Sequence, residues 1–143
     1  MTANPIPPLL EVPPLRDGDR LGRVEFEKRW EAMPEVKHAE LIDGVVQMPA
    51  LSRHHAVSHF GLIGWLWMYQ VLTPGSEGAD NASVRFDNNN MPQPDALLRV
   101  LESHGGQCCG TSDGYLEGAP ELVVEISHTT TDADLGPRRE VYR

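Results

Sequence analysis

The chain has 143 residues, of which 40% are hydrophobic and 23% charged, and its formal net charge is −9. This length is typical of one globular domain whose core needs no disulfides, and the negative charge argues against a protein that coats DNA through charge alone. No apolar run reaches the ~18–20 residues of a membrane helix, and the start lacks the features of a secretory signal. We therefore expect a cytoplasmic protein without a membrane segment, with a proline-rich arm (residues 1–20) before one domain (residues 21–143).

The domain begins with a segment that predicts a short helix over residues 24–33, because Phe26, Trp30 and Met33 recur at helical spacing. The next segment, AELIDGVVQMP, is rich in strand-forming residues. A glycine in its middle, Gly44, predicts a turn between two short strand pieces.

A long apolar segment follows, over residues 54–72, and contains no proline. This pattern favours a buried helix, for which Ser52 is a plausible N-cap. The aromatic residues Trp65, Trp67 and Tyr69 could stack on bases, but their place inside an apolar helix indicates core packing instead.

The second half predicts strands over residues 82–86, 94–101 and 121–127, and a helix with Asp134 as its N-cap. Residues 102–118 predict a long loop, which holds two neighbouring cysteines that we expect to be free thiols because a bridge between them would be strained. The apolar strand 121–127 is expected to be central in its sheet. The order of helix, strands, helix, strands, helix predicts a mixed α/β or α+β fold.

Three carboxylates stand at strand positions beside apolar stretches, namely Glu40, Asp95 and Glu125. Each has a plain structural alternative: Glu40 could form a surface salt bridge, Asp95 could open a turn after proline, and Glu125 could face water at a strand edge. Buried carboxylates are costly unless they are paired, and gathered like charges repel. Taken together, the three indicate an acidic cluster around a hard cation such as Mg²⁺.

Five ordered blocks of the sequence carry a resemblance to a known family: AELIDGVVQMP, LSRHH, QPDALL, GAPELVVEIS and TTTDADLGPRREVY. They resemble the Uma-two family of restriction endonucleases, which is assigned to the PD-(D/E)xK nuclease superfamily. The resemblance runs from about residue 21 to the end of the chain. It implies a PD-(D/E)xK sheet flanked by helices and a metal-dependent endonuclease that hydrolyses DNA phosphodiester bonds.

The resemblance also implies roles for individual residues. Asp95 would be the acid of the PD motif and Glu125 the acid of the E-x-K motif, and both would bind Mg²⁺ or Mn²⁺. The backbone carbonyl of Ile126 would be a further metal ligand, and Glu40 matches the family's upstream acid. His55 matches the family's histidine at a helix start and would approach the substrate, although His54, His55 and His59 could equally form the start of a helix and its solvent side.

The chain departs from the family pattern at the lysine. Ser127 occupies the lysine position of E-x-K, and the lysine that the family commonly moves to the next helix is Arg138 here. Helical spacing places Asp134, Arg138 and Tyr142 on one face. Arginine can stabilise negative charge but cannot act as a general base. We expect Arg138 to point toward the acidic cluster, and Ser127 and Tyr142 to contact the substrate, whereas the loop residue His128 is either solvated or near it.

Family members continue past the last helix into a further strand. We therefore expect a C-terminally truncated sheet that exposes a strand edge or apolar surface, which favours a homodimer or other association. The rival to a nuclease is a catalytically inactive, truncated homologue that acts as a binding or interaction module. The residues favour each reading in part, because the acids are intact and the lysine is absent.

Overall fold

The computed structural model describes residues 11–50, 52–127 and 131–143, without the side chains of residues 131–135. Helices and strands follow in the expected order, and the mixed α/β class is confirmed. The helices are α1 (Arg23–Glu31), α2 (Arg53–Leu72), the short 3₁₀ helix η1 (Glu102–His104) and α3 (Thr131–Val141). The strands are β1 (Glu40–Ile42), β2 (Val45–Gln47), β3 (Ser76–Asp80), β4 (Val84–Arg85), β5 (Ala96–Val100), β6 (Cys109–Gly110), β7 (Leu116–Glu117) and β8 (Leu122–Val124).

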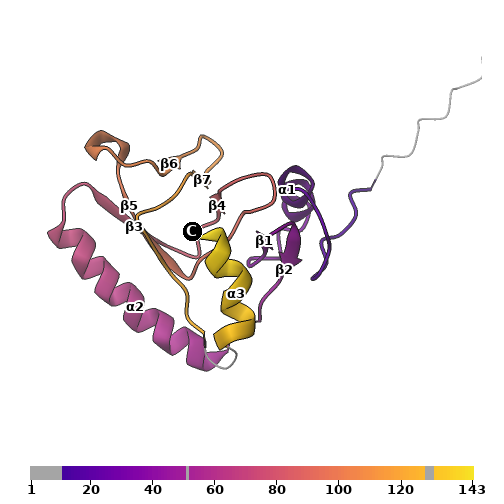
Figure 1. Ribbon diagram of the computed structural model, residues 1–143, viewed down its shortest axis with the longest axis horizontal. Helices are drawn as coiled ribbons and strands as arrows, with labels where there is room; N and C mark the ends of the chain where they lie inside the picture. Colours follow the sequence, from indigo (N-terminus) through magenta and orange to yellow (C-terminus); the bar gives the residue numbers. More distant parts are fainter. Residues whose placement is uncertain (1–10, 51, 128–130) are drawn as a thin grey trace, which may run out of the picture.

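The described strands form three small sheets. One is the antiparallel pair β1–β2, the second has the order β3–β5–β8 and is antiparallel, and the third has the order β4–β7–β6 with β4 and β7 parallel. Figure 1 shows α2 along one side of the β3–β5–β8 sheet, with α1 and the β1–β2 pair on the opposite side of the molecule. Helix α3 lies between these two parts.

The turn between β1 and β2 consists of Asp43 and Gly44, whose φ angles are 49° and 71°. Positive φ at both central residues is typical of a type I′ turn, which favours Asp-Gly and matches the twist of a two-stranded hairpin. The expected turn at Gly44 is therefore confirmed. The resulting register pairs Glu40 with Gln47.

Two separate hydrophobic clusters lie on either side of the region where α3 packs. The described part of the expected arm contributes to the first, because Leu15 is buried there, and the Gly18 N–H donates to the Val46 carbonyl. The first cluster contains Leu15, Phe26, Ala39, Leu41, Val46 and Met91. The second contains Leu66, Ala96 and Leu98, with Leu62, Ile63 and Val124 packed against it.

Helix α2 has the expected N-cap, since the Ser52 hydroxyl accepts a hydrogen bond from the His55 N–H at 3.2 Å. The expectation that the whole helix is buried is wrong. Trp65, Trp67 and Tyr69 are 63%, 60% and 49% exposed, because the sheet covers only one face of the helix. No helix in the described ranges is long and apolar enough to cross a membrane.

The expectation that the 121–127 strand is central is also wrong for the described chain. Strand β8 pairs only with β5 among the described strands, and Leu122 at its start is 37% exposed. Val124 still packs against the second hydrophobic cluster. The strand is apolar on that side because α2 covers it, and this pattern alone does not require a neighbour on both edges.

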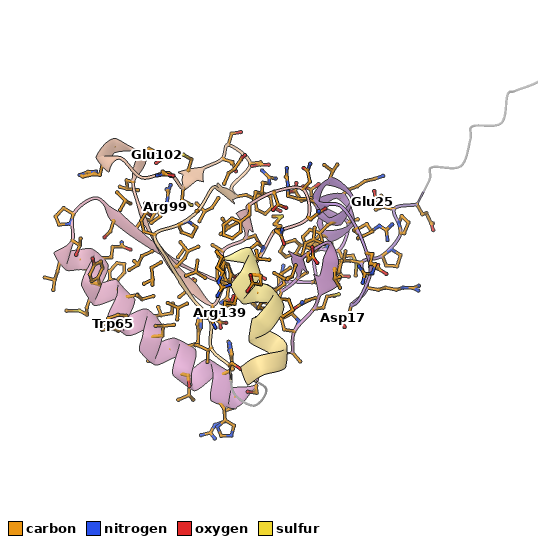
Figure 2. All side chains as sticks on the ribbon, viewed as in Figure 1. Asp17, Glu25, Trp65, Arg99, Glu102 and Arg139 are labelled. Carbon is orange, nitrogen blue, oxygen red and sulfur yellow. The ribbon has the colours of Figure 1, made fainter. Side chains whose placement is uncertain are left out.

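The segment 102–118 is more ordered than the expected loop, since it contains η1, β6 and β7. Arg99 anchors it by donating to the Cys108 carbonyl at 2.8 Å and by pairing with Glu102, beside which it lies in Figure 2. Cys108 is buried, Cys109 is exposed, and both are free. Helix α3 begins at Thr131, before the expected N-cap Asp134, whose side chain lies outside the described residues, as does His128.

Candidate active site

Asp95 lies immediately before β5 and is held by α2 on one side and by the chain after β8 on the other. Its Oδ1 lies 2.8 Å from His55 Nε2, and its Oδ2 accepts the backbone N–H of Ile126 at 2.6 Å. The Asp95 carbonyl is 2.7 Å from Nε2 of His59, one helical turn after His55. The side chain is therefore oriented at both oxygens, and only 8% of the residue is exposed.

Glu40 lies in β1 and Glu125 directly follows β8, and the two are joined by Arg138 of α3. The Arg138 guanidinium donates to Glu40 Oε1 and lies 3.4 Å from Glu125 Oε2. A further contact of 3.3 Å reaches Gln47 Oε1. Tyr142, which directly follows α3, donates its hydroxyl to Glu125 Oε1 at 2.7 Å.

Burial and mutual repulsion control the charge of the two glutamates. Burial raises the pKa of Glu40 above its ordinary value, against the attraction of Arg138. Burial likewise raises the pKa of Glu125 to about 7, where the charges of Glu40 and Asp95 add to the rise and the contacts with Tyr142 and Arg138 oppose it. Glu40 and Glu125 share one guanidinium and Asp95 lies against His55, so the cluster keeps a surplus of negative charge when all three carboxylates are ionised.

These groups line a cavity of about 560 Å³. All the site residues expected from the sequence are at its wall except Tyr142, which lies behind Glu125. The cavity is lined by Asp17, His38, Glu40, Gln47, Met48, Pro49, Ala50, His55, Asn81, Gln93, Asp95, Glu125, Ile126, Ser127, Pro137 and Arg138. Residues far apart in the sequence thus meet around one hollow.

Comparison with known families bears on this arrangement. Residues 24–143 match the model of the Uma2 family, whose description is "Putative restriction endonuclease". The chain belongs to the Uma2 family. The resemblance drawn from the five sequence blocks is therefore confirmed, and with it the relation to PD-(D/E)xK-like nucleases. No curated protein matches the chain significantly.

Nucleases of the kind to which Uma2 belongs typically use divalent metals. Within the described residues, no three His, Cys, Asp or Glu side chains are already arranged as a metal site. The donor chemistry nevertheless fits a hard cation, because Glu40, Asp95 and Glu125 offer carboxylate oxygens of the kind that Mg²⁺ prefers. Each is at present bound by groups of the chain itself, so a metal would have to compete with the guanidinium of Arg138.

Three residues that contact Glu40, Asp95 or Arg138 were not expected from the sequence, namely Gln47, His59 and Gln93. Gln47 could have been found, because a two-residue turn at Asp43–Gly44 places it directly opposite Glu40. His59 follows His55 by four residues and therefore shares its helix face, which was a usable signal. Gln93 donates its backbone N–H to Glu40 at 3.4 Å, a contact that depends on tertiary structure and has no sequence signature.

Proposed function

We propose that this protein hydrolyses phosphodiester bonds in DNA with the help of a divalent cation, Mg²⁺ or Mn²⁺. The observation that carries the proposal is the convergence of three carboxylates and a single guanidinium on one cavity wall, in a chain of a restriction-endonuclease-like family. Metal-dependent nucleases need such an acidic cluster, because the cation must be held beside a phosphate that is itself negative.

Asp95 and Glu125 would hold the cation, with the Ile126 carbonyl and Glu40 beside it. When bound, the cation would supply a Lewis acid that polarises the scissile phosphate and lowers the pKa of water. The raised pKa values of Glu40 and Glu125 support this assignment, because a nearby positive charge relieves the cost of ionising both groups. His55 and Tyr142 would keep the Asp95 and Glu125 carboxylates oriented.

Arg138 would serve the phosphate. Its planar guanidinium matches phosphate oxygens, and it remains charged throughout, so it can stabilise developing negative charge but cannot remove a proton. If an incoming cation bound the two glutamates in its place, Arg138 would lose its contacts with them and would be free to bind the substrate. Local positive charge matters in this chain, because a net charge of −9 opposes DNA binding elsewhere on the surface.

A second candidate is a catalytically inactive Uma2 homologue that acts as a binding or interaction module. The observation in its favour is that Arg138 already neutralises Glu40 and Glu125 from within the chain, while Ser127 stands where E-x-K carries lysine. In that case the guanidinium acts as a permanent structural substitute for the metal.

Metal binding and cleavage together test the proposal. We expect Mg²⁺ and Mn²⁺ to raise the melting temperature of the wild-type protein, because the ion binds only the folded state. Asp95→Asn should remove this shift, whereas Asp113→Asn, which changes a carboxylate outside the site, should keep it. In a plasmid-nicking assay with Mg²⁺, Asp95→Asn should lower the rate at least ~100-fold.

Arg138→Lys distinguishes the two candidates further, because it restores the lysine that the family commonly places on this helix. For an enzyme, this variant should nick plasmid at a rate equal to or above that of the wild type. If neither protein nicks DNA and neither shows a metal-dependent shift in melting temperature, the nuclease proposal fails and the inactive homologue is favoured.

A further inference from the structure

The outer face of α2 has the side-chain spacing of a helix that packs on another helix. Val57, Gly61, Gly64, Met68 and Val71 follow one another at intervals of four, three, four and three residues. This is the heptad spacing of paired helices. The valines and the methionine are 55–63% exposed, and nothing lies within 4 Å of where a Cβ would stand at either glycine. These five positions, here called the seam, are thus open, and the two glycines lie at their centre.

This face also lacks acidic residues, lysine and arginine over nearly its whole length. Residues 54–72 contain no Asp, Glu, Lys or Arg, although the whole chain has a net charge of −9. Phe60 and Leu72 beside the seam are 84% and 76% exposed. Two copies of so acidic a chain repel each other over most of their surfaces, so a contact between copies is least opposed here.

When the helix direction is reversed, the side chains of this face match those of a second copy in position and size. The midpoint of α2 (Arg53–Leu72) falls between the two glycines of the seam. A two-fold axis at this point sets Val57 against Met68 of the second copy and Phe60 against its Trp65. It also sets Arg53 against the C-terminal end of the second helix, where the helix dipole favours positive charge. Such self-complementarity is what an isologous dimer requires.

The size of the face matches this use. A helix of 20 residues is about 30 Å long, and aromatic side chains bury ~150–250 Å² each. With the exposed fractions of Phe60, Trp65, Trp67 and their aliphatic neighbours, the face offers on the order of 800 Å² per copy, which is close to the size of a standard specific interface. Figure 1 shows α2 at the edge of the molecule, with its outer side turned away from the sheets.

We propose that two copies of this chain form a dimer through α2, with the helices antiparallel about an axis between Gly61 and Gly64. The close approach allowed by the glycines lets Phe60 and Trp65 of opposite copies pack beside the axis. The proposal rests on α2 alone and is independent of the proposed nuclease activity.

Sedimentation equilibrium of the full chain tests the dimer. We expect the wild type to be dimeric and Met68→Glu to dimerise at least ~100-fold more weakly, because two buried like charges would face uncharged side chains at the seam. Val24→Glu on α1 is the matched control, since Val24 is 73% exposed and lies outside this face. Circular dichroism of both variants should match the wild type, which shows that any loss concerns association and not folding.

Spin labels at Leu72→Cys, in a Cys108→Ser and Cys109→Ser background, test the orientation. In the antiparallel pair the two labels stand at opposite ends, roughly 30 Å apart by the length of the helix. The proposal is overturned if the wild type is a monomer at every concentration, if Met68→Glu leaves the dimer intact, or if the two labels lie close together.

Discussion

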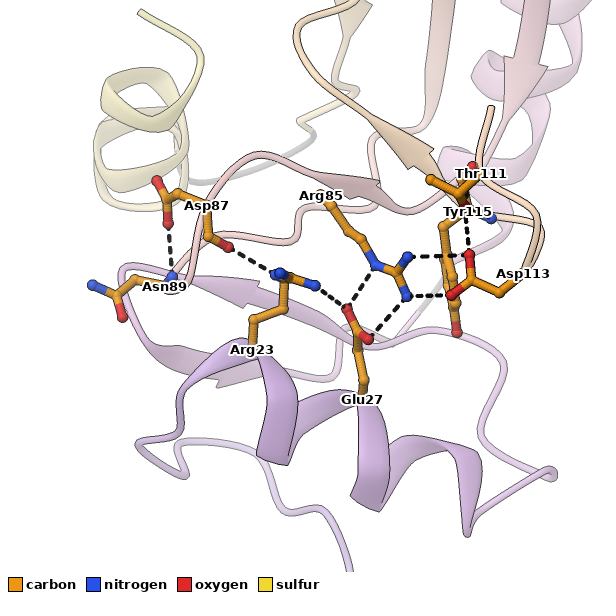
Figure 3. Close-up of polar contacts among 8 residues, drawn as sticks. All are labelled: Arg23, Glu27, Arg85, Asp87, Asn89, Thr111, Asp113 and Tyr115. Atoms are coloured by element: carbon orange, nitrogen blue, oxygen red, sulfur yellow. Dashed lines mark hydrogen bonds and ion pairs between the residues drawn. The ribbon is translucent and has the colours of Figure 1, made fainter. Parts of the chain in front are cut away.

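Two clusters in this molecule combine arginine with carboxylates, yet their charge states differ. The first, here called the Arg85 cluster, joins α1, β4 and the turn before β7, and Figure 3 shows it. Its charged members are Arg23, Glu27, Arg85 and Asp113. The second, the acidic site, lines the cavity, and its charged members are Glu40, Asp95, Glu125 and Arg138.

In the Arg85 cluster every carboxylate has a guanidinium. Arg85 donates to Glu27 at 2.8 and 2.9 Å and to Asp113 at 3.1 and 2.8 Å, and its guanidinium carbon lies 4.4 Å from the centre of the Tyr115 ring. Burial works to raise the pKa of Glu27, but hydrogen bonds from Arg85 and Arg23 lower it below the usual value. The pKa of Asp113 is lowered to about 2, chiefly by the hydrogen bond from Arg85 and to a smaller extent by the one from Thr111.

In the acidic site the balance is reversed, because one guanidinium serves both Glu40 and Glu125 and the like charge of Asp95 lies nearby. Burial then outweighs the attraction of Arg138, and the pKa values of Glu40 and Glu125 move upward. The comparison teaches that charge balance and burial, and not the presence of an arginine, decide what such a cluster can do. The Arg85 cluster is a joint between elements of the fold, whereas the acidic site retains a charge that a cation could take up.

The largest effect is expected from Arg138→Met, which breaks the acidic site while keeping side-chain length. The buried Glu40 and the partly buried Glu125 would lose the guanidinium that contacts both, and we expect a loss of about 3–5 kcal/mol in the free energy of unfolding at pH 7. Urea denaturation measures this, with Arg139→Met as the control because Arg139 is exposed. A loss as small as that of the control would show that the fold does not depend on this ion pairing.

A smaller effect is expected from Arg85→Met, which breaks the balanced cluster. The Asp113 side chain is 54% exposed, so water can replace much of the contact that this carboxylate loses. We expect a loss of about 2 kcal/mol in the same assay, with faster hydrogen exchange at residues 111–115. Lys28→Met, an exposed cation on α1, is the control. Equal losses for Arg85→Met and Arg138→Met would remove the distinction between the clusters.

The smallest effect is a difference in pH dependence. The folded pKa of Glu125 is about 7 against an ordinary 4.5, so its contribution to stability is full below pH 4.5 and is lost as pH rises to about 7. The folded pKa of Asp113 is about 2 against 3.8, so its contribution is present above pH 3.8 and is lost as pH falls toward 2. Melting temperatures across this range should show that Glu125→Gln removes the first dependence and Asp113→Asn the second. Unchanged profiles would contradict the assigned shifts.

Much of the fold could be predicted from local sequence signals. Helical spacing located α1, and a long apolar run without proline located α2. Ser52 capped α2 as expected, and Gly44 marked the hairpin turn. Strand β3 was missed because its sequence, SEGAD, lacks the apolar and β-branched residues of a typical strand, and its pairing with β5 is what makes it one. The exposure of α2 was missed because apolar composition does not reveal how many layers cover a helix.

The candidate site could be predicted as a set of residues but not as a geometry. Glu40, Asp95 and Glu125 were identified as a cluster because carboxylates beside apolar strands are costly unless a common partner, such as a cation, balances their charge. That Arg138 would bridge Glu40 and Glu125 directly depends on where α3 packs, which the spacing of its residues does not determine. The roles assigned to these residues stay predictions until metal binding and cleavage are measured.

The tight hairpin turn has a consequence for how this protein can change over generations. Side chains of a strand alternate between faces, so a single residue inserted at Asp43–Gly44 that shifts β2 by one position against β1 would exchange Gln47 with the core residue Val46. Such a shift would turn an amide toward the first hydrophobic cluster and remove Gln47 from its place opposite Glu40 in the cavity. The 102–118 segment contributes no residue to that wall and can vary in length without this penalty. We therefore expect natural variants to differ in length at the second position and to keep the first unchanged.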